Sequence, residues 1–393
     1  MNIDPKTLTG NWNYPTAMRF GPGRVRELSE ACKSLGMAKP LLVTDPGLRD
    51  LPMVANAIAD NNAAGIPTTL FADIKGNPVG QNVEDGVAAY KDARCDGVIA
   101  FGGGSALDAA KAIALMIGQS RPIWDFEDRE DWWTRVNEAG IAPIIALPTT
   151  AGTGSEVGRA SVITDEETHL KKIIFHPKMV PAIVISDPEL TIGLPKNITA
   201  WTGMDALAHC LEAYCAPGYH PMADGIALEG MRLVKDWLPI AVEDGGNLAA
   251  RAHMLVAATM GATAFQKGLG AIHALSHPIG AVHDKHHGLT NAVVMPYVLD
   301  FNRVAIEHRM TALARYLDLP NPSFDSFKKW VLDLRSQLDI EHTLADLGIG
   351  EEHVDELTPM AAIDPSCGGN PIPVGEPELR QMFLAAIRGE LAP

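Results

Sequence analysis

The sequence predicts an α/β domain with a mostly parallel β-sheet, followed by an all-helical domain. In the first half, short apolar runs alternate with segments of helical periodicity, a pattern that favours parallel strands with helices on both faces of the sheet. After about residue 188 the strand signals stop and long helical stretches take over. We place the boundary near 188–198, which gives domains of residues 1–190 and 191–393.

The individual elements follow from the same patterns. In the first domain we expect strands and helices in alternation, with strands at 40–44, 68–71, 97–101, 142–147 and 182–186 and helices at 53–64, 82–93 and 106–117. In the second domain we expect helices at 199–215, 222–242, 248–266, 272–282, 305–316, 323–338 and 376–388. Because proline lacks an N–H, we expect the prolines to interrupt these helices, namely Pro195, Pro217, Pro278, Pro296 and Pro320.

Composition limits the class of protein. The chain has 393 residues and a formal net charge of −16, which argues against nucleic acid and anionic membranes as partners. It has five cysteines and no CxxC pair, so we expect neither a disulfide framework nor a thiolate zinc site, and we expect a cytoplasmic location. Residues 1–6 do not resemble the start of a signal peptide, and we find no stretch of about 18 apolar residues.

A glycine cluster follows the strand expected at 97–101. Gly102, Gly103, Gly104 and Ser105 lie where this strand ends and the next helix begins. Glycines allow a backbone to approach a phosphate, and the N–H groups at a helix start bind anions. The spacing is neither GxGxxG nor GxxxxGK[ST], so a tight structural turn is the alternative.

Two further features point to a nucleotide. The sequence PTTAGTGSE at 148–156 follows the strand at 142–147, and its hydroxyls and glycines can line a phosphate or a nicotinamide; a simple polar loop is the alternative. Asp45 follows the strand at 40–44, where a carboxylate can accept hydrogen bonds from ribose hydroxyls. It would repel a 2′-phosphate, which favours NAD over NADP, although Asp45 can equally be a turn residue.

Histidines cluster in the second domain. Of the thirteen histidines, those between residues 273 and 287 are His273, His277, His283, His286 and His287. Upstream, Asp205 and His209 are four residues apart, which places both on one face of a helix. One carboxylate with several imidazoles suits Fe(II), Zn(II) or Co(II). Spacing alone does not choose among the clustered histidines, and any one of them can instead be a surface or core residue.

Several segments together resemble the iron-containing (group III) alcohol dehydrogenases. They are GGGSALDAAK at 102–111, PTTAGTGSE at 148–156, GMDALAHCLEAY at 203–214, AIHALSHPIGAVHDKHHGLTNAVVMP at 271–296 and SCGGNP at 366–371. The resemblance implies a Rossmann-like NAD(P)-binding domain and an all-helical, metal-binding catalytic domain. It further implies hydride transfer between a nicotinamide cofactor and a primary alcohol or aldehyde, in a homo-oligomer of two or more subunits.

The resemblance also assigns roles to residues. It implies a metal site, for Fe2+ or alternatively Zn2+, formed by Asp205, His209, His273 and His287. It implies cofactor contacts, with NAD or alternatively NADP, from Asp45, Asn77, Gly102, Gly103, Gly104, Ser105, Asp108, Thr149, Thr150, Thr153 and Lys172. His277 takes the position beside the nicotinamide and substrate, where we expect it to relay the hydroxyl proton, with packing against the cofactor as the alternative. Phe265 and Cys367 resemble residues that line the substrate pocket.

Two cationic residues bear on the substrate. The stretch 265–270 is one residue shorter than in the lactaldehyde-reductase branch and carries Lys267, and Arg159 follows the threonine-rich loop. They suggest a substrate with an acidic group, such as a carboxylate or sulfonate; the alternative is that both are surface residues. The competing functions are a metal-independent maleylacetate-type reductase, a lyase similar to dehydroquinate synthase, and a non-catalytic nucleotide- and metal-binding protein.

Overall fold

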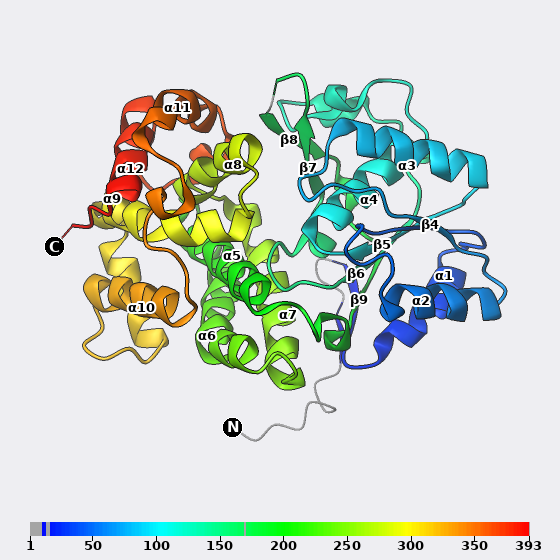
Figure 1. Ribbon diagram of the computed structural model, residues 1–393, viewed down its shortest axis with the longest axis horizontal. Coiled ribbons are helices and arrows are strands. Elements are labelled where there is room, and N and C mark those ends of the chain that lie inside the picture. The colour runs from blue at the N-terminus through cyan, green and yellow to red at the C-terminus, as the bar shows by residue number, and fades with distance from the viewer. Residues whose placement is uncertain (1–9, 13–15, 169, 393) are drawn as a thin grey trace. The chain divides into compact units, whose positions relative to one another are not determined.

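The computed structural model describes residues 10–12, 16–168 and 170–392. They form two compact units. The first consists of the described residues up to Thr150 together with Gly154–Ile192, and the second of Ala151–Thr153 together with the described residues from Gly193 onward. The first unit is built around a β-sheet, whereas the described part of the second contains helices and no strand (Figure 1). The predicted combination of an α/β and an all-α domain is therefore confirmed.

The central sheet of the first unit has seven strands in the order β1-β2-β9-β6-β5-β3-β4. Its strands are β1 (Gly10–Trp12), β2 (Ala17–Phe20), β3 (Leu41–Val43), β4 (Thr69–Phe71), β5 (Val98–Gly102), β6 (Ile144–Pro148) and β9 (Ile183–Ser186). β1 runs antiparallel to β2, and all the other neighbouring strands are parallel. The carboxyl ends of β3, β5 and β6 consequently lie at one edge, where open α/β sheets bind ligands.

Helices cover both faces of this sheet. They are α1 (Leu28–Ser34), α2 (Pro52–Ala63), α3 (Gly80–Ala93) and α4 (Gly104–Met116). On one face, Leu28 of α1 and Val54 of α2 share a core with Phe101 of β5. α3 and α4 lie on the opposite face (Figure 1). Because α4 is buried along almost its whole length, its first turn is held firmly at the end of β5.

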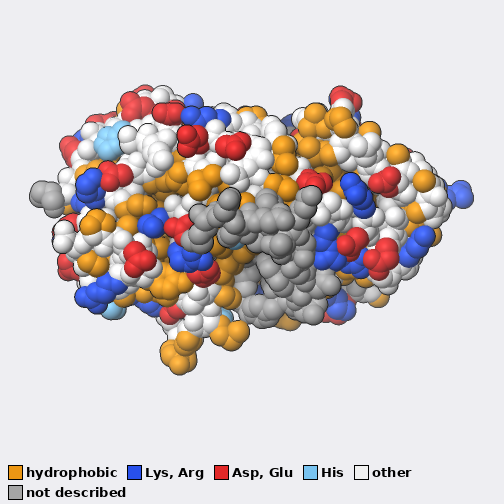
Figure 2. Space-filling view, turned by 90° about the horizontal axis from the view of Figure 1, so that it is seen from below, with side chains coloured by type: hydrophobic (Ala, Val, Ile, Leu, Met, Phe, Trp, Pro, Cys, Tyr) orange, Lys and Arg blue, Asp and Glu red, His pale blue; other side chains and the backbone are white. Residues whose placement is uncertain are grey.

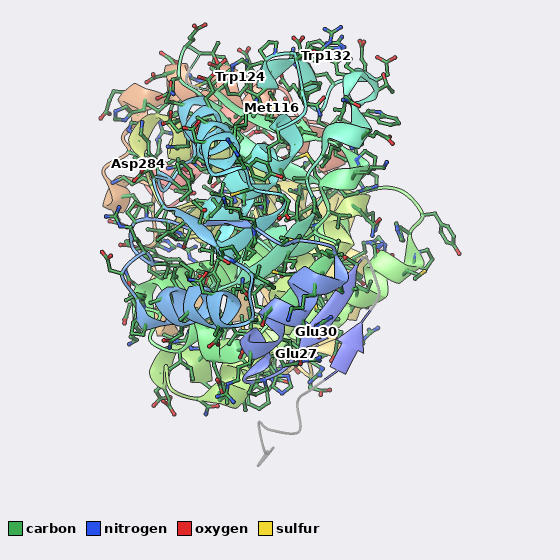
Figure 3. The ribbon with its side chains drawn as sticks, turned by 90° about the vertical axis from the view of Figure 1, so that its right-hand side faces the viewer. Glu27, Glu30, Met116, Trp124, Trp132 and Asp284 are labelled. Carbon is green, nitrogen blue, oxygen red and sulfur yellow. The ribbon has the colours of Figure 1, made fainter. Side chains whose placement is uncertain are left out.

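Three features of this unit were not predicted: the pair β1–β2, helix α1, and a two-stranded antiparallel hairpin of β7 (Ala160–Asp165) and β8 (Leu170–Phe175). Burial alternates along β7, but Ser161 and Asp165 are among its buried residues, so the sequence has no apolar alternation that would have revealed this strand. Arg19 on β2 forms ion pairs with Glu27 and Glu30, whose side chains lie near each other in Figure 3.

On the face shown in Figure 2, acidic and basic side chains are interspersed among apolar ones, so the negative charges do not form one continuous acidic patch there.

The second unit is a bundle around one buried helix. Its helices are α5 (Lys196–Cys215), α6 (Pro221–Glu243), α7 (Leu248–Ala264), α8 (Ala271–His283), α9 (His287–Tyr316), α10 (Phe324–Gln337), α11 (Val354–Ala362) and α12 (Glu376–Arg388). α5 packs against α6, α7 and α9, and every residue from Thr202 to Cys215 is buried. The predicted helices all form, and α11 was missed. Among the described residues, no helix is long and apolar enough to cross a membrane.

The expected interruption by proline was wrong at Pro296, whereas the helix expected at 272–282 already contained Pro278. Pro278 lies inside α8, and Pro296 lies inside α9, which begins at His287 and not near residue 305. The segment from Gly288 to Leu299 is buried on all sides. It therefore has no amphipathic period to reveal it as a helix, and its packing outweighs the N–H that Pro296 removes.

Candidate metal centre and nucleotide-binding loop

Three helices of the second unit bring one carboxylate and three imidazoles together. α5 carries the first two residues, α8 the third, and α9 begins with the fourth; they are Asp205, His209, His273 and His287. One ligand atom from each lies within 4.8 Å of every other. From Asp205 Oδ1, the Nε2 atoms of the histidines lie at 3.8 Å (His209), 3.8 Å (His273) and 3.5 Å (His287). This is the same set that the resemblance implies.

Small residues let the helices approach closely at this point. A Cβ built on Gly261 of α7 would lie 3.0 Å from the His209 Cβ, and one on Gly288 of α9 would lie 3.1 Å from the Asp205 Cβ. Contacts of 3.0–3.4 Å are tighter than ordinary Cβ contacts, so both helices pass against α5 only because glycine occupies these positions. The close approach of α9 places its first residue, His287, beside Asp205.

The electrostatics of this cluster fit a divalent cation. Asp205, His209 and His273 are buried, and the His287 side chain is 24% exposed. Burial lowers the pKa of His209 to about 4, which leaves this imidazole neutral, as a ligand must be. Among the described residues, no lysine or arginine forms an ion pair with Asp205. A buried carboxylate that faces imidazoles and pairs with neither lysine nor arginine is a place where a divalent cation would be stabilised.

Three residues around the cluster were not predicted. Asn291 directs its Nδ2 at Asp205 Oδ1 (2.8 Å) and lies 3.1 Å from His287 Nε2, while its own buried Oδ1 has no hydrogen-bond partner among the described residues. Ser276 Oγ lies 3.1 Å from His287 Nδ1, and Glu212 Oε2 lies 2.5 Å from His273 Nδ1. Helical spacing in the sequence could have revealed two of them, because Asn291 is four residues after His287 and Glu212 is three residues after His209.

His277 lies beside the cluster without adding a ligand atom to it. Its ring stacks on that of His287 with centroids 5.2 Å apart, and its Nδ1 lies 2.7 Å from Asp364 Oδ2. Burial alone would raise the pKa of Asp364, but the charge and hydrogen bond of His277 and the Ser366 N–H outweigh burial, so the pKa is lowered. The Asp364 carboxylate therefore accepts from Nδ1 and leaves Nε2 as the nitrogen that can exchange a proton.

The glycine cluster forms a loop at the carboxyl end of β5, in the first unit. A Cβ on Gly102 would lie 2.7 Å from the Ala106 Cβ and would collide with it, and one on Gly103 would lie 3.2 Å from the Thr150 Cγ2 and would require Thr150 to shift. α4 begins at Gly104 with no side-chain cap, which leaves the N–H groups of its first turn for an anion. Thr149 N–H donates to the Gly102 carbonyl oxygen at 3.0 Å and joins β6 to this loop.

Asp45 also lies at this edge of the sheet. Its Oδ1 accepts the N–H groups of Gly47 (2.9 Å) and Leu48 (3.2 Å), which makes it a turn residue. Its Oδ2 lies 3.4 Å from the position of a Cβ on Gly102. The structure therefore brings Asp45, the glycine loop, Thr149 and Thr150 together.

Other predicted cofactor residues are engaged within the protein. Ser105 Oγ donates to the Gly76 carbonyl oxygen, next to the predicted Asn77. The two carboxylate oxygens of Asp108 accept from Ser155 Oγ (2.5 Å) and Val162 N–H (2.9 Å). Lys172 pairs with Asp165 at 2.6 Å and lies 5.0 Å from the ring centroid of Trp124, labelled in Figure 3. Thr153 belongs to the second unit.

The predicted substrate residues have different surroundings. The Phe265 ring lies 5.0 Å from the His209 ring, beside the cluster. Lys267 Nζ lies 2.5 Å from Asp224 Oδ1, and its side chain is 2% exposed, so it is already engaged in a buried ion pair. Arg159 is exposed in the first unit, 5.6 Å from the Phe175 ring centroid. Burial raises the pKa of the Cys367 thiol to about 12, which keeps it protonated near neutral pH.

A glycine loop at the end of a parallel sheet and a buried carboxylate–imidazole cluster in a helical unit are features of nucleotide- and metal-dependent oxidoreductases. The chain belongs to the iron-containing alcohol dehydrogenase family. The family model described as iron-containing alcohol dehydrogenase matches residues 15–188, and the model for the C-terminal part of that family matches residues 199–387. The predicted membership is confirmed, and the chain is an NAD(P)-dependent alcohol dehydrogenase of the iron-containing type, a class of metal-dependent alcohol and aldehyde oxidoreductases.

Three relatives illustrate the similarity. A 4-hydroxybutyrate dehydrogenase from Cupriavidus necator is 37% identical over 380 residues, which cover 94% of this chain and 98% of the relative. An NAD-dependent methanol dehydrogenase from Bacillus methanolicus is 33% identical, over 96% of this chain and 100% of the relative. The crystal structure of a 1,3-propanediol oxidoreductase superposes with a TM-score of 0.90 at 34% identity, over 94% of this chain and 97% of that one.

Proposed function

We propose that Asp205, His209, His273 and His287 hold one Fe2+ ion, with Zn2+ as the alternative, and that the enzyme interconverts a short primary alcohol and its aldehyde with NAD. The convergence of four ligand atoms to within 4.8 Å carries this proposal. Three imidazoles and one carboxylate are a donor set that borderline divalent ions accept. When bound, such an ion supplies Lewis-acid chemistry to an alcohol oxygen.

The protein's own residues bind the cofactor and move the proton. The loop from Gly102 to Gly104 binds the pyrophosphate through backbone N–H groups, and Asp45 accepts a ribose hydroxyl, which favours NAD. In oxidation, the carbinol carbon gives a hydride to the nicotinamide, and the hydroxyl gives its proton to His277 at Nε2. Asp364 supports this step, since it holds the Nδ1 proton in place.

We also propose that the alcohol carries a carboxylate at its far end. The support is the 4-hydroxybutyrate dehydrogenase among the relatives, together with the exposed guanidinium of Arg159. Lys267 does not contribute to this proposal, because its buried ammonium group is already paired with Asp224. The free state of all five cysteines supports a reducing cytoplasm as the location, where we propose that the enzyme acts as a homo-oligomer.

Reconstitution tests the metal and the reaction together. The metal-free protein is loaded with Fe2+ under anaerobic conditions, or with Zn2+, and NADH formation is followed at 340 nm with 4-hydroxybutyrate and 1,4-butanediol. His273→Ala should lose both bound metal and turnover, whereas His283→Ala, on the same helix but outside the cluster, should retain both. Full turnover by metal-free His273→Ala protein would favour a metal-independent reductase, and tight binding of metal and NAD without turnover would favour a non-catalytic protein.

A further inference from the structure

A second buried carboxylate, Glu212, lies directly behind the metal cluster. Its Oε2 is 2.5 Å from His273 Nδ1, and its Oε1 accepts the Ile272 N–H at 2.7 Å. The residue is 6% exposed. Among the described residues, its ion-pair partner is His273, and neither lysine nor arginine pairs with it. Burial of a carboxylate is costly unless hydrogen bonds, an ion pair or a nearby cation stabilises its charge.

The surrounding structure fixes this carboxylate in place. A Cβ on Gly270 would lie 3.0 Å from Glu212 Oε1, so the chain entering α8 passes close against it. The Asn370 Oδ1 accepts the Ala271 N–H at 3.2 Å and holds this segment. Glu212 also lines a small, largely apolar pocket together with Leu211 and Val298. Such surroundings offer little water to compete for the carboxylate, which strengthens its bond to the imidazole.

The position of Glu212 determines which nitrogen of His273 is free. An imidazole that donates its Nδ1–H to a carboxylate keeps the lone pair on Nε2. His273 Nε2 is the atom that faces Asp205 Oδ1 at 3.8 Å, within the cluster. The carboxylate also increases the electron density on that nitrogen, which makes it a stronger ligand. By contrast, His287 Nδ1 faces the uncharged hydroxyl of Ser276.

Charge balance leads to the same conclusion. Asp205 and Glu212 are two buried carboxylates without a lysine or arginine partner among the described residues. The third nearby carboxylate, Asp364, is paired with His277. A histidine must be neutral to bind a metal, so in the metal-bound state these two carboxylates would match the charge of one divalent cation.

We infer that Glu212 is a positioning residue of the metal centre: it holds His273 in the tautomer that presents Nε2 and strengthens that nitrogen as a ligand. This inference depends on the proposed metal site. The Glu212→Gln substitution preserves the size of the side chain. Its amide NH2 must face either the Ile272 N–H or the His273 Nδ1–H, so one of the two hydrogen bonds is lost and the negative charge is removed.

The test compares Glu212→Gln with Asp364→Asn, which removes the carboxylate behind His277. Zn2+ affinity is measured by competition with a chromogenic chelator, and the visible absorption spectrum is recorded after loading with Co2+. We expect Glu212→Gln to bind Zn2+ roughly 10–100-fold more weakly and to shift the Co2+ bands. Asp364→Asn should change neither. Equal affinity and an unchanged Co2+ spectrum in Glu212→Gln would overturn the inference.

A measurement on the unmodified chain covers the case in which Glu212→Gln does not fold. In Zn2+-loaded protein labelled with 15N-histidine, the His273 side chain should show a proton on Nδ1 and none on Nε2. A proton on Nε2 would refute the role of Glu212. Failure of the unmodified protein to bind Zn2+ or Fe2+ at all would instead refute the metal site itself.

Discussion

Gly288 lies so close to Trp201 that a Cβ at position 288 would be 2.2 Å from the Trp201 carbonyl oxygen. Because the obstructing atom belongs to the backbone of α5, it cannot move aside as the end of a side chain can. α9 therefore reaches the cluster only with glycine at this position. Glycine at position 288 thus allows His287 Nε2 to lie 3.5 Å from Asp205 Oδ1.

We predict that Gly288→Ala separates α9 from α5 and weakens both stability and metal binding. Overpacking of this kind costs about 1–3 kcal/mol of unfolding free energy. The measurements are the thermal midpoint without metal and the Zn2+ affinity. Gly225→Ala on α6 is the control, because a Cβ there meets nothing within 4 Å. An unchanged midpoint and affinity in Gly288→Ala would show that the two helices are not closely fitted.

The sequence was sufficient for the features that depend on local pattern. Strands followed by glycine, and helices with one apolar face, are visible in a window of about 15 residues. The i,i+4 spacing of Asp205 and His209 is also a local pattern that can be seen in such a window. The start of α9 was missed because its first half is buried on all sides and contains Pro296.

What the sequence could not show depends on contacts between distant segments. Lys267 looked like a free cation, but it is paired with Asp224, 43 positions away. His277 could be singled out, whereas Asp364 lies 87 residues further on, and no spacing rule links the two. The pairing of His273 with Glu212 across 61 residues is equally non-local.

We predict that His277→Ala lowers kcat by roughly 10²-fold while leaving Zn2+ content unchanged, since the imidazole moves a proton but adds no ligand atom to the cluster. Asp364→Asn should also lower kcat, because an amide NH2 facing Nδ1 reverses the tautomer of His277. The double variant should be no slower than His277→Ala alone. Additive losses in kcat would show that the two residues act independently.

Removal of the metal should lower stability as well as activity. A ligand that binds only the folded state adds about 2.7 kcal/mol at a concentration one hundred times its Kd. We therefore expect the thermal midpoint to fall after chelation and to rise with each increment of Zn2+. In His209→Ala protein, Zn2+ should have little effect on the midpoint. A midpoint that is independent of Zn2+ in the unmodified protein would contradict a metal site in the folded helical unit.

The roles of the two cationic residues can be separated by substrate choice. Arg159→Ala should raise KM for 4-hydroxybutyrate about 10-fold and leave KM for 1,4-butanediol unchanged, since a charge-assisted hydrogen bond contributes on the order of 1.5 kcal/mol. Lys267→Met should leave the KM ratio of these two alcohols unchanged. It should instead lower the unfolding free energy by roughly 2 kcal/mol, which is less than the loss of a fully buried pair. The reason is that Arg309 still pairs with Asp224 at 3.0 Å, and that the Asp224 side chain is 26% exposed. If Lys267→Met selectively raised KM for 4-hydroxybutyrate with no loss of stability, Lys267 would instead be a substrate-binding residue.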